Sequence, residues 1–110
     1  MAKLSLKKVF EIVRALEGVT EKDHFGGDAF LANGKIFATV WSKTNTANLM
    51  LNLEQQKQLL SIDGEGFVAL NNAWGRKGAT CVQIEIAERS DFEDAITLAF
   101  NNAKKKSKKS

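Results

Sequence analysis

The chain has 110 residues, of which 44% are apolar and 26% charged, a balance typical of a single globular domain. Its apolar runs span only a few residues, whereas a membrane-crossing helix needs about 20, so we expect no membrane span. The N-terminus lacks the apolar stretch of a secretory signal, and Cys81, the one cysteine, leaves no internal disulfide. We therefore expect a cytoplasmic protein.

The positive charge of the chain is concentrated at its C-terminus. The formal net charge is +3, but five of the sixteen basic residues lie within positions 104–110. Subtracting these five leaves 11 basic against 13 acidic residues, so the rest of the chain has a net charge of −2. We expect residues 1–103 to form one domain and residues 104–110 a disordered, lysine-rich tail. Such a tail either keeps the protein soluble or contacts a polyanion.

The first element that the sequence predicts is a helix. Apolar residues recur at three- and four-residue spacing over residues 6–16, which is typical of an amphipathic helix. Ser5 precedes this segment as an N-cap residue, and Gly18 follows it as a stop signal.

A β-hairpin follows. Residues 28–32 and 35–41 are strand-like, and Asn33-Gly34 between them favours the positive φ angles of a type I′ turn. This turn pairs Leu31 with Ile36 and, in continuous register, Phe30 with Phe37. We expect one face of the hairpin to pack on the helices: Ala29, Leu31, Ile36, Ala38 and Val40. We expect the other face to stay open: Phe30, Ala32, Lys35, Phe37, Thr39 and Trp41.

The second half of the chain predicts two helices and three strands. A third strand covers residues 48–51, and a capping box of Asn52 and Gln55 opens a helix that ends near Asp63-Gly64. Strands at 66–70 and 80–86 follow, and Ser90 and Glu93 open the last helix. The predicted fold is a two-layer α+β domain with an antiparallel sheet and the order αβββαββα.

The sequence offers few groups for catalysis or metal binding. His24 is the one histidine, and no nucleophile or second ligand is placed beside it by spacing. We interpret His24 as a structural or surface-lining residue and Cys81 as a small buried residue. The sequence therefore predicts neither an enzyme, nor a cofactor, nor a metal site.

One loop combines an aromatic side chain with two cations. Trp74, Arg76 and Lys77 lie within four residues, beside Gly75 and Gly78. Such a loop can stack on a base and hold a phosphate. In the alternative interpretation Trp74 folds over the open sheet face, and both cations are solvated.

Several segments, in order, resemble the MmcQ/YjbR family. They are residues 15–21, His24-Phe25-Gly26, residues 34–38, residues 74–80 and the closing alanine-rich helix. The resemblance implies the αβββαββα order, a fold similar to type III secretion chaperones, and a likeness to a double-wing DNA-binding module. The positions that match are His24, Phe25, Gly26, Gly34, Lys35, Phe37, Trp74, Gly75 and Arg76.

The chain departs from that family in two places. Asn52 stands where many members have a lysine, and Asn71-Asn72-Ala73 replaces a basic or histidine-containing segment. Both departures remove potential phosphate contacts.

Two functions follow as hypotheses. In the first, a nucleic-acid-binding module, phosphates meet Lys35, Arg76, Lys77 and the tail, while Phe37, Trp41 or Trp74 touches bases. In the second, a protein-interaction domain, the aromatic sheet face binds a second copy or another protein.

Overall fold

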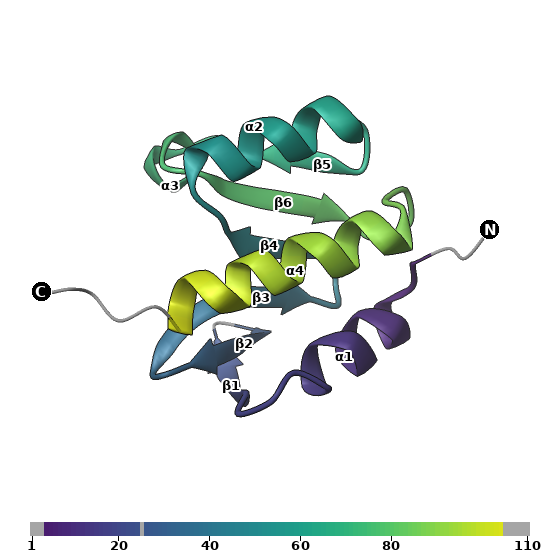
Figure 1. Cartoon of the computed structure of the whole chain (residues 1–110). Coiled ribbons are helices and arrows are strands. Elements are labelled where there is room, and N and C mark those ends of the chain that lie inside the picture. The colour runs from purple at the N-terminus through teal and green to yellow at the C-terminus, as the bar shows by residue number, and fades with distance from the viewer. Residues whose placement is uncertain (1–3, 25, 105–110) are drawn as a thin grey trace, which may run out of the picture.

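The computed structural model describes residues 4–24 and 26–104, which form four helices and six strands (Figure 1). The strands make one antiparallel sheet in the order β1-β2-β3-β4-β6-β5, and α1, α4 and α2 cover one of its faces. The predicted two-layer α+β class is confirmed. In chain order the elements are α1 (Leu6–Arg14), β1 (Thr20–His24), β2 (Gly27–Ala32), β3 (Lys35–Trp41), β4 (Thr46–Met50), α2 (Leu53–Ile62), β5 (Phe67–Ala69), α3 (Ala73–Arg76), β6 (Ala79–Gln83) and α4 (Arg89–Lys104).

Local sequence signals determine where several elements begin and end. The Ser5 hydroxyl accepts the amide of Lys8 and caps α1, and Asn52 with Gln55 forms the predicted capping box of α2. Asn33 and Gly34 adopt φ angles of 54° and 77°, as the predicted tight turn requires. These predictions are confirmed.

Two elements were not predicted, which corrects the element order to αββββαβαβα. The first is β1, an edge strand whose residues are all polar and therefore lack the apolar alternation of a strand. It is joined to α1 by a two-pronged ion pair between Arg14 and Glu21, with nitrogen–oxygen distances of 2.9 and 3.0 Å. The guanidinium lowers the pKa of the Glu21 carboxyl. The second is the four-residue helix α3, which lies within the predicted loop at residues 71–78.

A β-bulge in β3 sets the two faces of the sheet. Leu31 pairs with Ile36, but Phe30 pairs with Ala38, so Phe37 is an extra residue with no partner on β2. An extra residue in one strand reverses the alternation of side chains beyond it. Phe37 and Ala38 are consequently both buried on the helix side, while Ile36 faces the other way.

The predicted face assignment is therefore wrong in part. Phe30, Ala32 and Phe37 lie in the core and not on the open face. The Phe37 ring meets that of Phe100 from α4 edge-on, with centroids 5.4 Å apart, and Phe30 contacts Phe10 of α1. Thr39 and Trp41 do lie on the open face, as predicted, and Ala38 and Val40 lie in the core, as predicted.

The last helix reaches into the segment predicted as a tail, because α4 ends at Lys104. The Lys104 carbonyl accepts a hydrogen bond from the Asn33 side chain in the β2–β3 turn. The rest of the predicted tail, 105–110, lies outside the described residues, and so does Phe25. Among the described residues, no helix has the length and apolar character needed to cross a membrane.

We expect the substitution Phe37→Ala to lower the free energy of unfolding by about 3–5 kcal/mol, because it opens a cavity beneath α4. Its neighbour Ile36 is only half-buried, so Ile36→Ala serves as the matched control and should cost less than half as much. Urea unfolding followed by far-ultraviolet circular dichroism measures both. Equal costs would contradict the bulge and the face assignment drawn from it.

Candidate functional site

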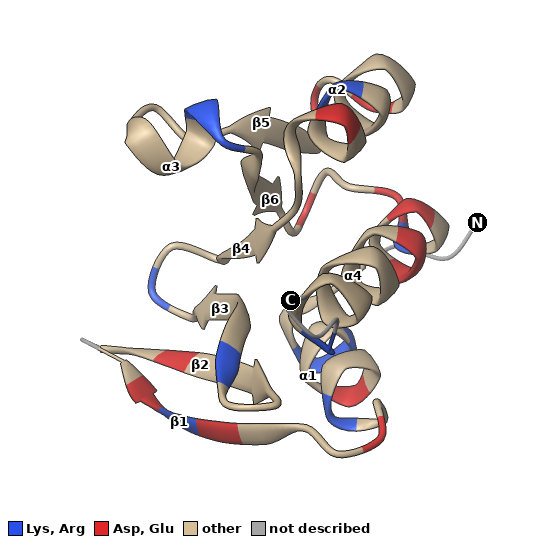
Figure 2. Ribbon diagram, turned by 60° about the vertical axis from the view of Figure 1, so that its left-hand side comes forward, with Lys and Arg blue, Asp and Glu red and all other residues tan. Residues whose placement is uncertain are grey.

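The sheet face away from α1, α2 and α4 has a mixed polar and apolar surface. In β4 the residues alternate, with Ala47 and Leu49 buried towards the helices and Thr46, Asn48 and Met50 half-buried on the other face. Figure 2 shows that face edge-on, with α3 projecting from one end of the sheet on the side opposite α4 and the β1–β2 pair at the other end. The face is thus bordered at both ends, and its recessed part lies over β3 and β4.

A hollow of about 450 Å³ occupies this recess. Its wall residues come from β1, β3, β4 and the β5–α3 segment, so positions far apart in the chain meet there. They are His24, Ile36, Thr39, Trp41, Asn48, Met50, Leu70, Asn72 and Trp74. A concave, largely apolar surface with a few amide and hydroxyl groups is the usual form of a ligand-binding site.

Trp41 is held firmly in one wall. Its ring lies over Gly27 of β2, where a Cβ atom would come within 2.8 Å of the indole, so only glycine allows this approach. The indole N–H donates to the Thr39 hydroxyl at 3.0 Å, and the His24 ring meets the indole edge-on at a centroid distance of 6.0 Å. This wall is therefore preorganised.

Trp74 forms the opposite wall and is 64% exposed, the largest exposed aromatic group among the described residues. It lies on α3, which Asn72 caps by accepting the amide of Gly75. Gly75 is buried, and a Cβ atom there would collide with the Leu70 carbonyl. The Lys77 ammonium is 5.9 Å from the centroid of the Trp74 ring.

A buried glutamine supports α3 from the helix side of the sheet. The Gln56 side chain on α2 donates to the carbonyls of Gly75 and Ala79, each at 2.9 Å. The two carbonyls flank the segment that carries Arg76 and Lys77. The position of Trp74 and its neighbouring cations therefore depends on a residue outside the hollow.

A second hollow of about 440 Å³ adjoins the first and shares Ile36, Met50 and Trp74 with it. Its other wall residues are Lys35 and three residues near the end of α4: Ala99, Asn102 and Ala103. The Asn102 side chain donates to the Met50 carbonyl at 3.3 Å and fixes α4 to the end of β4. The two hollows therefore adjoin at these three shared side chains, one of which is Trp74.

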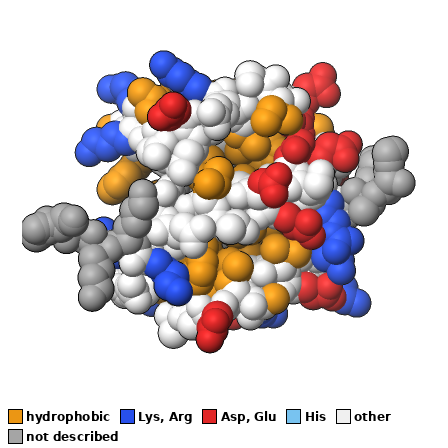
Figure 3. All heavy atoms as spheres, in the orientation of Figure 1, with side chains coloured by type: hydrophobic (Ala, Val, Ile, Leu, Met, Phe, Trp, Pro, Cys, Tyr) orange, Lys and Arg blue, Asp and Glu red, His pale blue; other side chains and the backbone are white. Residues whose placement is uncertain are grey.

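Charge is distributed unevenly around the protein. None of the described residues that line the two hollows is acidic, and Lys35, Arg76, Lys77 and Lys104 lie around them. Acidic side chains gather on the helix side, around the start of α4 (Figure 3), while others lie on β1 and β2 (Figure 2). The group around the start of α4 includes Asp63, Glu88, Asp91, Glu93 and Asp94. The net charge of −2 over residues 1–103 is therefore compatible with a groove that attracts anions.

The groups with chemical reactivity are sparse here. Cys81 is half-buried on the open face, where burial raises the pKa of its thiol and so reduces its thiolate fraction at neutral pH. Within residues 4–24 and 26–104, no group of three or more His, Cys, Asp or Glu side chains is placed to hold a metal ion. What the arrangement offers is binding through aromatic rings, amides and cations.

The structure brings together three of the residues singled out in the sequence: His24, Trp41 and Trp74. Lys35 lines the adjoining hollow, and Arg76 and Lys77 are exposed on and beside α3. Phe37 is separated from all of them by the sheet. Sequence reasoning missed Ile36, because the bulge was not foreseen. It also missed Asn48 and Met50, although the alternation over residues 46–50 places them on one face.

Comparison with known proteins bears on the fold alone. No protein-family model matches the chain, and no curated protein matches it. The structure is similar to the crystal structure of Deinococcus radiodurans protein DR2400, described by the domain DUF419, with a TM-score of 0.78 and 10% sequence identity. The match covers 96% of this chain and 82% of that one. The two proteins therefore share a fold over nearly the whole described domain.

We expect Gln56→Leu to lower the free energy of unfolding by about 1–3 kcal/mol, since two buried hydrogen bonds are lost without a replacement. It should also speed amide hydrogen exchange in α3. The exposed Lys57→Gln on the same helix is the control, with a change below about 0.5 kcal/mol. Unchanged exchange in α3 would show that Gln56 does not hold this segment.

Proposed function

We propose that the protein binds single-stranded nucleic acid in the groove between Trp41 and Trp74. The observation that carries the proposal is the pairing of a fixed indole with an exposed one across an uncharged hollow. Bases stack on such aromatic platforms, and each stacked base contributes about 1–3 kcal/mol. The amides of Asn48 and Asn72 supply hydrogen-bond partners for base edges.

The surrounding cations support the same proposal. Lys35, Arg76 and Lys77 lie beside the hollows, where a backbone that passes over Trp74 would place its phosphates. Lys104 ends α4 near the β2–β3 turn, and the sequence continues with four more lysines. Phosphate contacts of this kind give affinity without sequence preference.

Fold similarity adds support of a weaker kind. DUF419 is related to the YjbR/MmcQ-like fold, and the segments at His24, Lys35 and Trp74 resemble that family. Membership of the family and the DNA-binding role proposed for it are therefore part of this proposal. Asn72, one of the departures from the family pattern, lines the hollow and takes a base-contacting role in place of a phosphate contact.

The test measures binding of a labelled single-stranded oligonucleotide of about 12 nucleotides, a length within the usual site sizes of such proteins. Two proteins are compared, the full chain and a chain that ends at Lys104. Both should bind, the shorter chain more weakly. Trp74→Ala in the shorter chain should weaken binding by about tenfold or more. Arg76→Ala should lower the slope of log affinity against log salt by about 0.7.

Lys57→Ala on α2 is the matched control, because it removes a cation from the helix side of the molecule. It should leave both affinity and slope nearly unchanged. If the shorter chain fails to bind at low salt, or if Trp74→Ala binds like the parent, the proposal is wrong.

The open face also suits a second candidate, a protein-interaction surface. Val68 is 44% exposed and pairs with Cys81 on the same face as Asn48, so apolar exposure extends beyond Trp74. In that case the full chain should self-associate in sedimentation velocity, and Trp74→Asp should abolish the association without unfolding the protein. A monomer at all concentrations would argue against a dimer on this face.

A further inference from the structure

An apolar groove lies between α2 and α4, on the side of the sheet away from the proposed nucleic-acid site. Its floor consists of the buried residues Leu51, Leu59 and Ala95. Its walls carry Ile62 from α2 and Leu98 from α4, which are 67% and 39% exposed. The cavity volume is about 190 Å³. Exposed apolar walls over a buried apolar floor indicate a surface on which another chain packs.

A hydrogen bond joins the two helices at one end of this groove. The Asn102 side chain near the end of α4 donates to the Gln55 side chain in the first turn of α2 at 2.8 Å. α2 is associated mainly with β5 and β6, whereas α4 crosses β2, β3 and β4. The space between Ile62 and Leu98 is left unfilled because the two helices pack on different strands (Figure 1).

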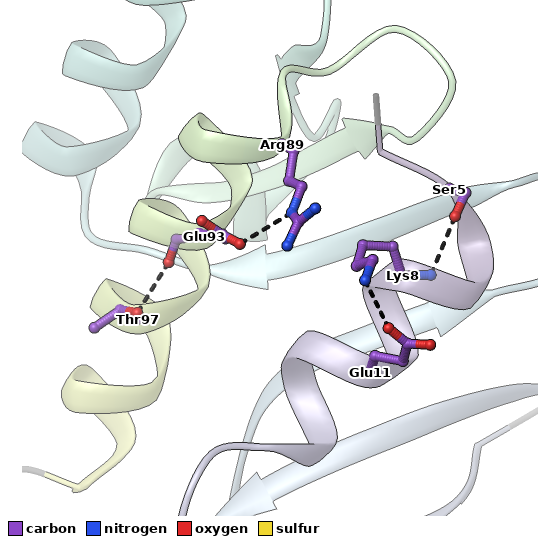
Figure 4. A network of polar contacts seen from close by, with 6 residues as sticks. All are labelled: Ser5, Lys8, Glu11, Arg89, Glu93 and Thr97. Atoms are coloured by element: carbon purple, nitrogen blue, oxygen red, sulfur yellow. Dashed lines mark hydrogen bonds and ion pairs between the residues drawn. The ribbon is translucent and has the colours of Figure 1, made fainter. Parts of the chain in front are cut away.

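The rim of the groove is negatively charged. Asp91 and Asp94 line it, and within the described part of the chain neither has an ion-pair partner. The nearest basic residue in sequence, Arg89, is engaged by Glu93 on the same helix at 3.1 Å, a contact that Figure 4 shows from close by. Loss of solvent raises the pKa of Asp91, and repulsion from Asp63, Glu88 and Asp94 adds to the effect. A cation placed here would relieve that repulsion.

We propose that the α2–α4 groove binds an amphipathic helix of a partner protein, with apolar side chains directed into the groove and lysine or arginine residues along its flank. Binding of a helix in an apolar groove uses anchors at three- and four-residue spacing. With ten residues, α2 is about 15 Å long, which matches roughly three turns of such a helix. The acidic rim favours partner helices with a cationic flank and raises the rate at which they associate with the groove.

The chain's own C-terminus does not fit this description. Residues 104–110 consist of lysine and serine, so they match the acidic rim but offer nothing to the apolar walls. Ile62 and Leu98 would stay exposed beside such a segment. The apolar walls and the charged rim together therefore point to a different protein.

The test uses the full chain and a labelled synthetic helix of leucine and lysine arranged with an apolar stripe, followed by fluorescence anisotropy. A peptide of the same composition in scrambled order and polylysine are the comparison ligands. The striped peptide should bind, the scrambled one at least about tenfold more weakly, and polylysine should not displace it at physiological salt. Equal binding of striped and scrambled peptides, or displacement by polylysine, would mean charge attraction alone and would overturn the proposal.

Variants locate the binding. Ile62→Ser and Leu98→Ser should each weaken it by about tenfold, and Asp91→Asn combined with Asp94→Asn should reduce its salt dependence. Leu53→Ser is the matched control, since Leu53 is 42% exposed on α2 but does not line the groove. Circular dichroism verifies that each variant is folded. Weakening by Leu53→Ser to the same extent would overturn the assignment to this groove.

The experiment is independent of nucleic-acid binding, so its failure leaves the proposed function intact.

Discussion

The β-bulge at Phe37 is the constraint on which the rest of the structure depends. One unpaired residue places Phe37 and Ala38 together beneath α4 and turns Ile36 to the opposite face. Without it, continuous alternation from the Asn33-Gly34 turn would direct Ala38 and Val40 to the open face and Thr39 and Trp41 into the core. The same bulge therefore shapes both the core and the candidate groove. It keeps Phe37 and Ala38 in the core beneath α4, while Ile36 lines the groove on the other face.

Sequence reasoning worked where the signal was local. The Asn33-Gly34 turn and the Asn52 capping box depend on neighbouring residues only, and both form as predicted. Sequence reasoning failed where tertiary contacts determine the local structure. The strand at 20–24 is polar throughout and forms because the edge of β2 pairs with it, and the bulge depends on how Phe37 packs against α4. Residues 71–78 were predicted as a loop, but they contain α3, and neither this helix nor its support by Gln56 has a signature in the local sequence.

The two surfaces differ in chemistry. This difference explains why the net charge of the chain does not by itself indicate which ligands each surface attracts. The open sheet face combines tryptophans, amides and peripheral cations, while the helix face combines exposed aliphatic side chains with the carboxylates of Asp91 and Asp94. Their charges lie at opposite ends of α4, which also satisfies the helix dipole, with Asp91 in its first turn and Lys104 in its last. In the two proposals, the anion-binding and cation-binding surfaces of this small domain do not compete, so a protein partner on the helix face would leave the groove at Trp74 free.

The most direct test of the central claim, that single-stranded nucleic acid occupies the groove between the two tryptophans, is nuclear magnetic resonance of the isotope-labelled full chain during titration with an oligonucleotide. The claim predicts that the largest shifts fall on the indole N–H groups of Trp41 and Trp74 and on the side-chain amides of Asn48 and Asn72, while Ile62 and Leu98 stay unchanged. Shifts confined to residues beyond Lys104, with both indole signals unmoved, would contradict it.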